Sequence, residues 1–120
     1  MRRRDDEAAL LDVAAEMAEV ARVATLRHFR TTGLLADSKE AARFDPVTVA
    51  DREAEAAMRA VLARRRPGDA ILGEEMGLSA GRSGLTWVLD PIDGTRGYLA
   101  GTPTWGVLIA VSDPQGPVYG

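Results

Sequence analysis

Several residue types and patterns are scarce in this 120-residue chain, and each scarcity narrows what the protein can be. The chain has no cysteine, which excludes disulfide bonds, thiolate metal sites and cysteine nucleophiles. No apolar run approaches the length of a membrane span, and the acidic residues directly after Met1-Arg2-Arg3-Arg4 argue against a secretion signal. The net charge of −3 gives no overall attraction to nucleic acid. We therefore expect a cytoplasmic protein with neither a membrane nor a nucleic acid as partner.

The apolar residues predict two amphipathic helices, over about residues 6–30 and 49–65. Thr48-Val49-Ala50-Asp51 fits a capping box at the start of the second helix, and Pro67-Gly68 follows its end. Apolar side chains recur at helical spacing on one face of each segment. These are Leu10, Val13, Met17, Val20 and Ala24 in the first helix, and Ala54, Met58, Val61 and Leu62 in the second.

Short apolar runs predict strands at residues 70–73, 86–89 and 104–112. Residues 76–84 are rich in glycine and serine, which is typical of a surface loop. A turn at residues 113–116 predicts that the last strand returns as a hairpin. The expected fold class is therefore α+β, with two helices packed on a mainly antiparallel sheet.

Three acidic segments occur in order along the chain. They are Asp45-Pro-Val-Thr48-Val-Ala-Asp51, Gly73-Glu74-Glu75 and Asp90-Pro-Ile-Asp93-Gly94-Thr95, and the last two directly follow predicted strands. Two carboxylates about 4 Å apart repel by about 4 kcal/mol at an effective dielectric constant of about 20. A hard divalent cation with oxygen ligands would offset that repulsion. Pro91 fixes its own φ and restrains the preceding Leu89-Asp90 to extended geometry, so both side chains are held in place.

Each segment alone also has an ordinary explanation. Asp51 fits a helix cap, Glu74 and Glu75 fit a solvated loop, and Asp90 to Gly94 fits a turn. Their joint occurrence, two of them directly after predicted apolar strands, favours a metal site over three unrelated structural features.

Together the three segments resemble the signatures of the inositol monophosphatase family of Mg²⁺-dependent phosphomonoesterases. The resemblance covers essentially the whole chain, and the run from Gly94 to Gly106 is most like the histidinol-phosphatase branch. It implies a layered α/β/α/β/α sugar-phosphatase fold. It also implies that residues 1–120 are the amino-terminal metal-binding portion of a longer domain, because the family's second half, with its Trp-Asp motif, is absent.

The resemblance also assigns roles to individual residues. Glu74, Asp90, the backbone carbonyl of Ile92 and Asp93 would hold Mg²⁺. Thr95, hydrogen-bonded to Asp51, would orient the attacking water together with Glu74. The backbone amides of Gly94 and Thr95 would receive the phosphate, as at a helix N-terminus. The implied substrate-binding residues are Glu74, Asp90, Ile92, Asp93, Gly94 and Thr95.

The implied function is Mg²⁺-dependent hydrolysis of a phosphate monoester, with L-histidinol phosphate, an intermediate of histidine biosynthesis, favoured as substrate. Alternatives within the family are inositol-1-monophosphatase and other sugar or nucleotide phosphatases. Outside catalysis, the chain could be a truncated Mg²⁺- or phosphate-binding module or a partner subunit, or a structural domain that holds Ca²⁺. We expect a small phosphorylated metabolite as partner and a homodimer for the full-length form. We expect the 120-residue chain alone to be inactive or weakly active.

Overall fold

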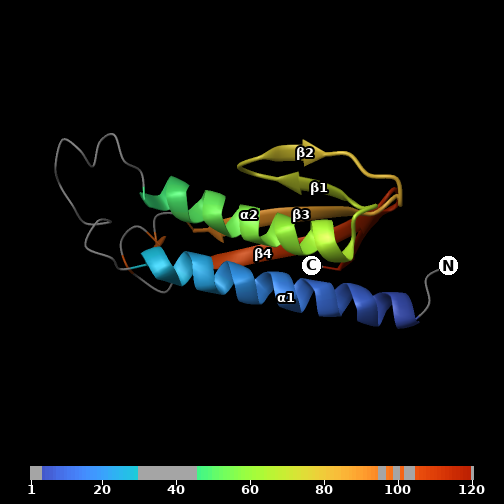
Figure 1. Ribbon diagram of the computed structural model, residues 1–120, viewed down its shortest axis with the longest axis horizontal. Coiled ribbons are helices and arrows are strands. Elements are labelled where there is room, and N and C mark those ends of the chain that lie inside the picture. Colours follow the sequence, from blue (N-terminus) through green and yellow to red (C-terminus); the bar gives the residue numbers. More distant parts are fainter. Residues whose placement is uncertain (1–3, 30–45, 95–96, 99–100, 102–104, 120) are drawn as a thin grey trace.

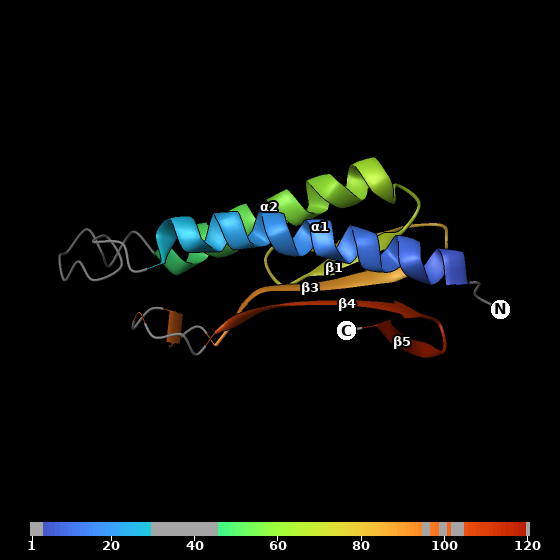
Figure 2. The same ribbon diagram turned by 90° about the horizontal axis from the view of Figure 1, so that it is seen from below.

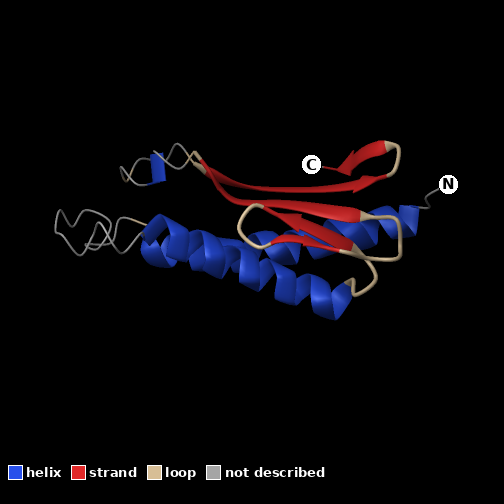
Figure 3. Cartoon of the chain, turned by 90° about the horizontal axis from the view of Figure 1, so that it is seen from above, coloured by secondary structure: helices blue, strands red, loops and turns tan. Residues whose placement is uncertain are grey.

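Two helices cover one face of a five-stranded sheet. The computed structural model describes residues 4–29, 46–94, 97–98, 101 and 105–119. Its elements are α1 (Arg4–His28), α2 (Pro46–Arg65), β1 (Ala70–Gly73), β2 (Gly77–Ser79), β3 (Thr86–Asp93), β4 (Gly106–Asp113) and β5 (Gly116–Tyr119). The helices form one layer and the sheet the other (Figure 3).

The sheet has the strand order β2-β1-β3-β4-β5. Within the described residues, β1 and β3 run parallel, and the other three pairings are antiparallel. The predicted fold class, two helices on a mainly antiparallel sheet, is thereby confirmed. The parallel pair aligns the carboxyl ends of β1 and β3.

The core lies between the helices and the sheet. Alternate residues of the strands, including Trp87 and Leu89, face the helices and are buried. They pack against the apolar faces of α1 and α2, which lie side by side in Figure 1. The predicted core positions Met17, Met58 and Leu62 have no exposed surface. Helical periodicity therefore located the core correctly.

The opposite face of the sheet is apolar, and neither described helix covers it (Figure 3). Leu72, Val88 and Leu108 point to this face and are 45%, 38% and 53% exposed. β5 pairs only with residues 111–113 of β4, and Figure 2 shows it curving away from the rest of the sheet. Neither described helix is both long enough and apolar enough to cross a membrane.

Three local predictions are wrong. First, α2 begins at Pro46, so Thr48 lies inside the first turn and is not its cap; proline suits the first helical position because its φ is already helical. Second, the predicted loop contains β2, which forms a hairpin with β1. Gly77, the first residue of β2, directly follows the three-residue connection and has φ of +73°, a conformation that glycine adopts freely.

The third correction concerns the predicted turn after residue 89. Instead of turning, the chain continues as β3 to Asp93, and the pairing with β4 shifts register between Asp90 and Asp93. Pro91 lies within this irregularity and has no amide proton to donate to a ladder, which explains why the regular pairing breaks there. The two acidic residues therefore lie on an irregular strand end, whose geometry is set by the sheet.

Candidate metal site

The parallel pairing of β1 and β3 brings two of the acidic segments together. Gly73 is in register with Leu89, and the Glu74 amide donates a hydrogen bond to the Leu89 carbonyl at 3.3 Å. The next residue on each strand is acidic, so Glu74 lies beside Asp90. Two carboxylates 16 positions apart in sequence thus meet at the carboxyl ends of neighbouring strands, where open α/β sheets commonly bind ligands.

The negative charges at this strand end repel one another. Contact with Asp90, and the negative charge of Asp90, are the main causes that raise the pKa of Glu74 above its ordinary value. Partial burial and the charges of Glu75 and Asp93 raise this pKa further. The arrangement favours whatever supplies positive charge to the pair, whether a proton or a cation.

Asp90 carries an oxygen atom that the fold leaves unsatisfied. Its Oδ1 is buried and has no hydrogen-bond partner within the described part of the chain. Such an orphaned acceptor costs free energy, so a native structure that keeps one needs an explanation. A bound cation at Oδ1 would provide it.

The donor set fits Mg²⁺ better than a cation that needs a full protein cage. Among the described residues, no three acidic or histidine side chains converge as a ready-made cage. Mg²⁺ commonly uses only one or two carboxylates and fills its remaining positions with water and substrate phosphate. Glu74 and Asp90 meet that requirement.

The other predicted site residues are placed less completely. Asp93 is exposed at the end of β3, and Ile92 is buried just before it. Gly94 has φ of +83°, a left-handed conformation that favours glycine, and its carbonyl accepts a hydrogen bond from the Tyr98 amide at 3.1 Å. Thr95 lies outside the described residues, so its predicted roles in catalysis and in phosphate binding stay predictions.

An aromatic cluster anchors the segment that follows β3. The Tyr98 hydroxyl donates to the Thr25 carbonyl at 2.8 Å, and its ring packs against Phe29 and, edge-on, against Trp105. Burial raises the pKa of Tyr98 to about 12, with smaller contributions from the charges of Asp51 and Glu53. This cluster ties the chain after Gly94 to the end of α1.

Asp51 lies near this cluster, half-buried in the early part of α2. Its charge acts on Tyr98, whose amide bonds to Gly94. The start of α2 therefore adjoins the segment after β3, and Figure 2 shows these parts together at one end of the molecule. The predicted hydrogen bond from Asp51 to Thr95 stays a prediction, because Thr95 is not described.

Sequence reasoning missed Tyr98 and Glu55. Glu55 is a fully buried acid whose carboxylate binds the backbone just after Glu74. The available signal was its place on the apolar face of α2, next to Ala54 and three residues before Met58. A carboxylate buried on such a face requires hydrogen-bonding or positively charged partners.

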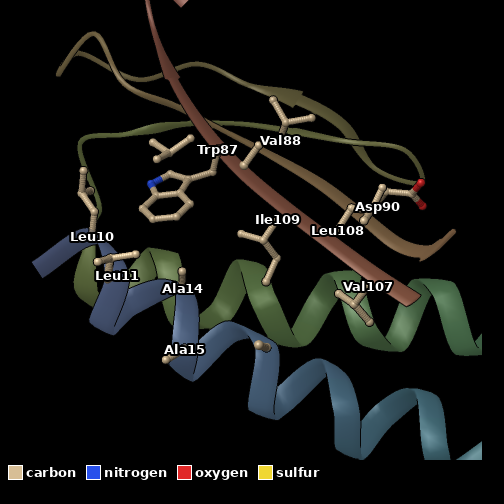
Figure 4. A pocket seen from close by; sticks show the side chains of 13 residues that line it. Leu10, Leu11, Ala14, Ala15, Trp87, Val88, Asp90, Val107, Leu108 and Ile109 are labelled. Carbon is tan, nitrogen blue, oxygen red and sulfur yellow. The ribbon is translucent and has the colours of Figure 1, made fainter. Parts of the chain in front are cut away.

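A separate apolar groove of about 870 Å³ lies between α1 and the β3–β4 pair. Figure 4 shows Leu10 and Leu11 of α1 on one side, facing Trp87 and Ile109. The carboxylate of Asp90 lies at the far end of the view from Trp87. Because the lining is otherwise apolar, the groove does not suit a charged phosphate group, and the candidate site is the strand end beyond it.

Comparison with known proteins agrees with this geometry. The sequence pattern of the inositol monophosphatase family matches residues 6–120. The chain is 41% identical over 110 residues to the histidinol-phosphatase of Mycobacterium tuberculosis, a match that covers 92% of this chain and 42% of that protein. It is 51% identical over 71 residues to the inositol-1-monophosphatase of Mycobacterium leprae, covering 55% and 24% respectively.

A solved structure gives the same result for the fold. The inositol monophosphatase from Zymomonas mobilis superimposes with a TM-score of 0.75 at 40% identity, covering 98% of this chain and 43% of that one. The chain therefore spans about two-fifths of the length of the histidinol-phosphatase and of this structural neighbour.

Proposed function

This chain belongs to the inositol monophosphatase family, and we propose that it forms the amino-terminal, metal-binding portion of a Mg²⁺-dependent phosphatase. Members of this family are metal-dependent and act on small phosphorylated substrates. The observation that carries the proposal is the contact between Glu74 and Asp90 at the ends of two parallel strands, together with the unsatisfied Oδ1 of Asp90.

In the proposed site, Glu74, Asp90 and the carbonyl of Ile92 would hold one Mg²⁺, and Asp90 and Asp93 would hold a second. When bound, Mg²⁺ supplies the positive charge that stabilises phosphoryl transfer to water. The protein's own part is to hold these oxygens in place, and the register of β1 and β3, which sets Gly73 opposite Leu89, supports this for Glu74 and Asp90. The segment from Gly94 presents backbone amides to the phosphate.

Proton handling in this proposal falls to three side chains. Asp51 and Thr95 would form one hydrogen-bonded pair, and Glu74 would act beside them to orient the attacking water.

The proposed substrate is L-histidinol phosphate, which gives L-histidinol and phosphate. The support is the histidinol-phosphatase match, which extends over nearly the whole chain. An inositol monophosphate is the second candidate, because the shorter match to an inositol-1-monophosphatase has the higher identity. The proposal also includes a cytoplasmic location and a homodimer for the full-length protein.

The proposal treats residues 1–120 as part of a larger domain. Its support is the share of the relatives' length that the chain spans and the uncovered apolar face around Leu72, Val88 and Leu108. Exposed apolar patches of this kind mark surfaces that pack against something else. On this view the isolated chain binds Mg²⁺ but turns over substrate weakly.

Isothermal titration of the chain with Mg²⁺ tests the metal site. We expect binding by the wild type and at least tenfold weaker binding by Glu74→Gln and Asp90→Asn. Asp12→Asn is the matched control, because Asp12 is an exposed carboxylate paired with Arg65 on α2. Absence of Mg²⁺ binding by the wild type, or equal binding by all variants, would contradict the proposed site.

Phosphate release tests the activity. The chain is assayed alone and joined to the remaining carboxyl-terminal part of the Mycobacterium tuberculosis histidinol-phosphatase, with L-histidinol phosphate and inositol 1-phosphate as competing substrates. We expect weak turnover alone, a large gain in the joined protein, and a higher kcat/KM for L-histidinol phosphate. A preference for inositol 1-phosphate would move the substrate assignment to the second candidate.

A further inference from the structure

We propose that Glu55 is a positioning residue that holds Glu74 in the geometry needed to bind metal. The inference rests on the proposed metal site, and it adds a residue of α2 that neither sequence reasoning nor the comparisons assign. Glu55 itself is not a metal ligand in this proposal. It acts on the backbone that carries Glu74.

The carboxylate of Glu55 binds the backbone of the turn that directly follows Glu74. Its Oε1 accepts a hydrogen bond from the Glu75 amide at 2.9 Å, and its Oε2 accepts one from the Met76 amide at 2.8 Å. The side chain of Glu55 has no exposed surface. Hydrogen bonds from amides to a buried carboxylate are stronger than neutral ones, because the acceptor is charged and water is excluded.

The same carboxylate also fills the space beside the residue that precedes Glu74. A Cβ atom added to Gly73 would lie 2.4 Å from the carboxyl carbon and from Oε2 of Glu55. Gly73 is therefore glycine because Glu55 occupies the place of its side chain. The Glu55 carboxylate thus lies close to the backbone before Glu74 and accepts two hydrogen bonds from the backbone after it.

Arg59 completes the arrangement one helical turn along α2. Its Nε donates to Oε2 of Glu55 at 3.0 Å, and its remaining nitrogens donate to the Gly77 carbonyl and to the Ser79 hydroxyl. The charge of Glu55 is thus neutralised by a partner that also binds β2. The whole β1–β2 hairpin, with Glu74 near its tip, is fixed to α2.

Burying the charges of Glu55 and Arg59 costs free energy, because both groups lose their hydration. A buried ion pair can often be replaced by apolar residues without loss of stability. An apolar residue at position 55 would suit the apolar residues near it on α2. What an apolar residue could not do is bind the two amides after Glu74. Partners of metal ligands that fix ligand orientation typically change metal affinity by 10- to 100-fold when they are removed.

The test compares Glu55→Gln with Glu74→Gln, and uses Glu16→Gln as the matched control. Glu16 also pairs with arginines, Arg64 and Arg65, but it joins the two helices away from the strand end. Glutamine at 55 keeps the shape but presents an amide NH₂ to a backbone N–H, so one of the two hydrogen bonds is lost. Mg²⁺ affinity is measured by calorimetry, and thermal unfolding in EDTA checks that each variant is folded.

A second readout needs no metal. Amide hydrogen exchange in EDTA, followed by NMR, reports the Glu75 and Met76 amides directly. We expect Glu55→Gln to speed the exchange of at least one of these amides tenfold or more, and to weaken Mg²⁺ binding by about 10- to 100-fold. Glu16→Gln should change neither. Unchanged exchange of both amides, or unchanged Mg²⁺ affinity in a folded Glu55→Gln variant, would overturn the proposal.

Gly73→Ala provides an independent variant should Glu55→Gln fail to fold. It retains every charge and displaces the Glu55 carboxylate by steric contact, so we expect weaker Mg²⁺ binding in the same direction. The double variant should lose less than the two single effects combined, because both act through one contact. Full additivity, or normal binding by Gly73→Ala, would overturn the proposal.

The outcomes separate this inference from the proposed function. If Glu74→Gln loses Mg²⁺ and Glu55→Gln does not, the metal site stands and the role of Glu55 is wrong. If Glu74→Gln binds Mg²⁺ as the wild type does, the metal site is wrong and the inference falls with it.

Discussion

The carboxylates at the two ends of the parallel pair β1–β3 differ in how well the described residues satisfy them with hydrogen bonds. At the amino end, Asp69 accepts hydrogen bonds from Arg66, Ser83 and the indole of Trp87 at 2.6–2.9 Å. At the carboxyl end, Glu74 and Asp90 contact each other, and one oxygen of Asp90 has no partner among the described residues. This difference supports the proposal that the carboxyl end, where the described residues leave one oxygen of Asp90 without a partner, binds a cation.

The largest expected loss of stability comes from replacing Asp69, whose carboxylate has hydrogen-bond partners. Asp69→Ala leaves the buried indole N–H of Trp87 without its acceptor and Arg66 without its partner. We expect a loss of about 3 kcal/mol in the free energy of unfolding, which urea titration followed by tryptophan fluorescence measures. Asp12→Ala, which removes an exposed carboxylate, should cost under about 0.5 kcal/mol. Comparable losses in the two variants would remove the contrast between partnered and solvated acids.

The pH dependence of this loss has a fixed sign. Burial alone would raise the pKa of Asp69, but the hydrogen bonds from Arg66, Ser83 and Trp87 outweigh it and lower the pKa below the ordinary value of 3.8. The stabilisation is therefore present above pH 3.8 and is lost as the pH falls through the lowered pKa. Wild type and Asp69→Ala should converge in stability toward strongly acidic pH.

A smaller effect is expected from Tyr98, which lies at the carboxyl end but is itself satisfied. Tyr98→Phe removes the hydrogen bond to the Thr25 carbonyl and should cost about 1 kcal/mol of unfolding free energy. Burial raises the pKa of Tyr98 to about 12, so absorbance titration of the wild type should contain a tyrosine step near pH 12. That step should be missing in the variant. Its persistence would mean that the ring is not buried as described.

Local patterns predicted those parts of the fold that local physics determines. The buried faces of both helices follow from periodicity, as Met17 and Met58 illustrate. β2 was missed because its three residues are exposed and paired only through the backbone to β1, so no apolar alternation marks them. The start of α2 was misplaced because a Thr-x-x-Asp pattern fits a cap wherever it occurs.

The candidate site was predictable in its members but not in its geometry. The acidic motifs identified Glu74 and Asp90, yet only the parallel register of β1 and β3 places them in contact. Glu55 could not be assigned a role from sequence, because its partners are backbone amides about 20 residues away. Backbone amides carry no sequence signature, so a carboxylate that binds them is visible only in the folded structure.

The smallest expected effect is the change in stability of Glu74→Gln without metal. It tests most directly whether the carboxylates differ between the two ends of the β1–β3 pair. The pKa of Glu74 is raised, chiefly by Asp90, so the ionised pair destabilises the metal-free fold as the pH rises above the ordinary value of 4.5 through the raised pKa. In EDTA at pH 7, Glu74→Gln should therefore be more stable than the wild type, by less than about 1 kcal/mol because Glu74 is exposed. The two proteins should be equally stable below pH 4.5, where both carry an uncharged side chain at position 74. Adding Mg²⁺ should reverse the order at pH 7, since binding stabilises only the chain that keeps its ligand. A Gln variant that is less stable in EDTA at pH 7 would mean that Glu74 has a stabilising partner, and the carboxyl end would then be no more strained than the end that holds Asp69.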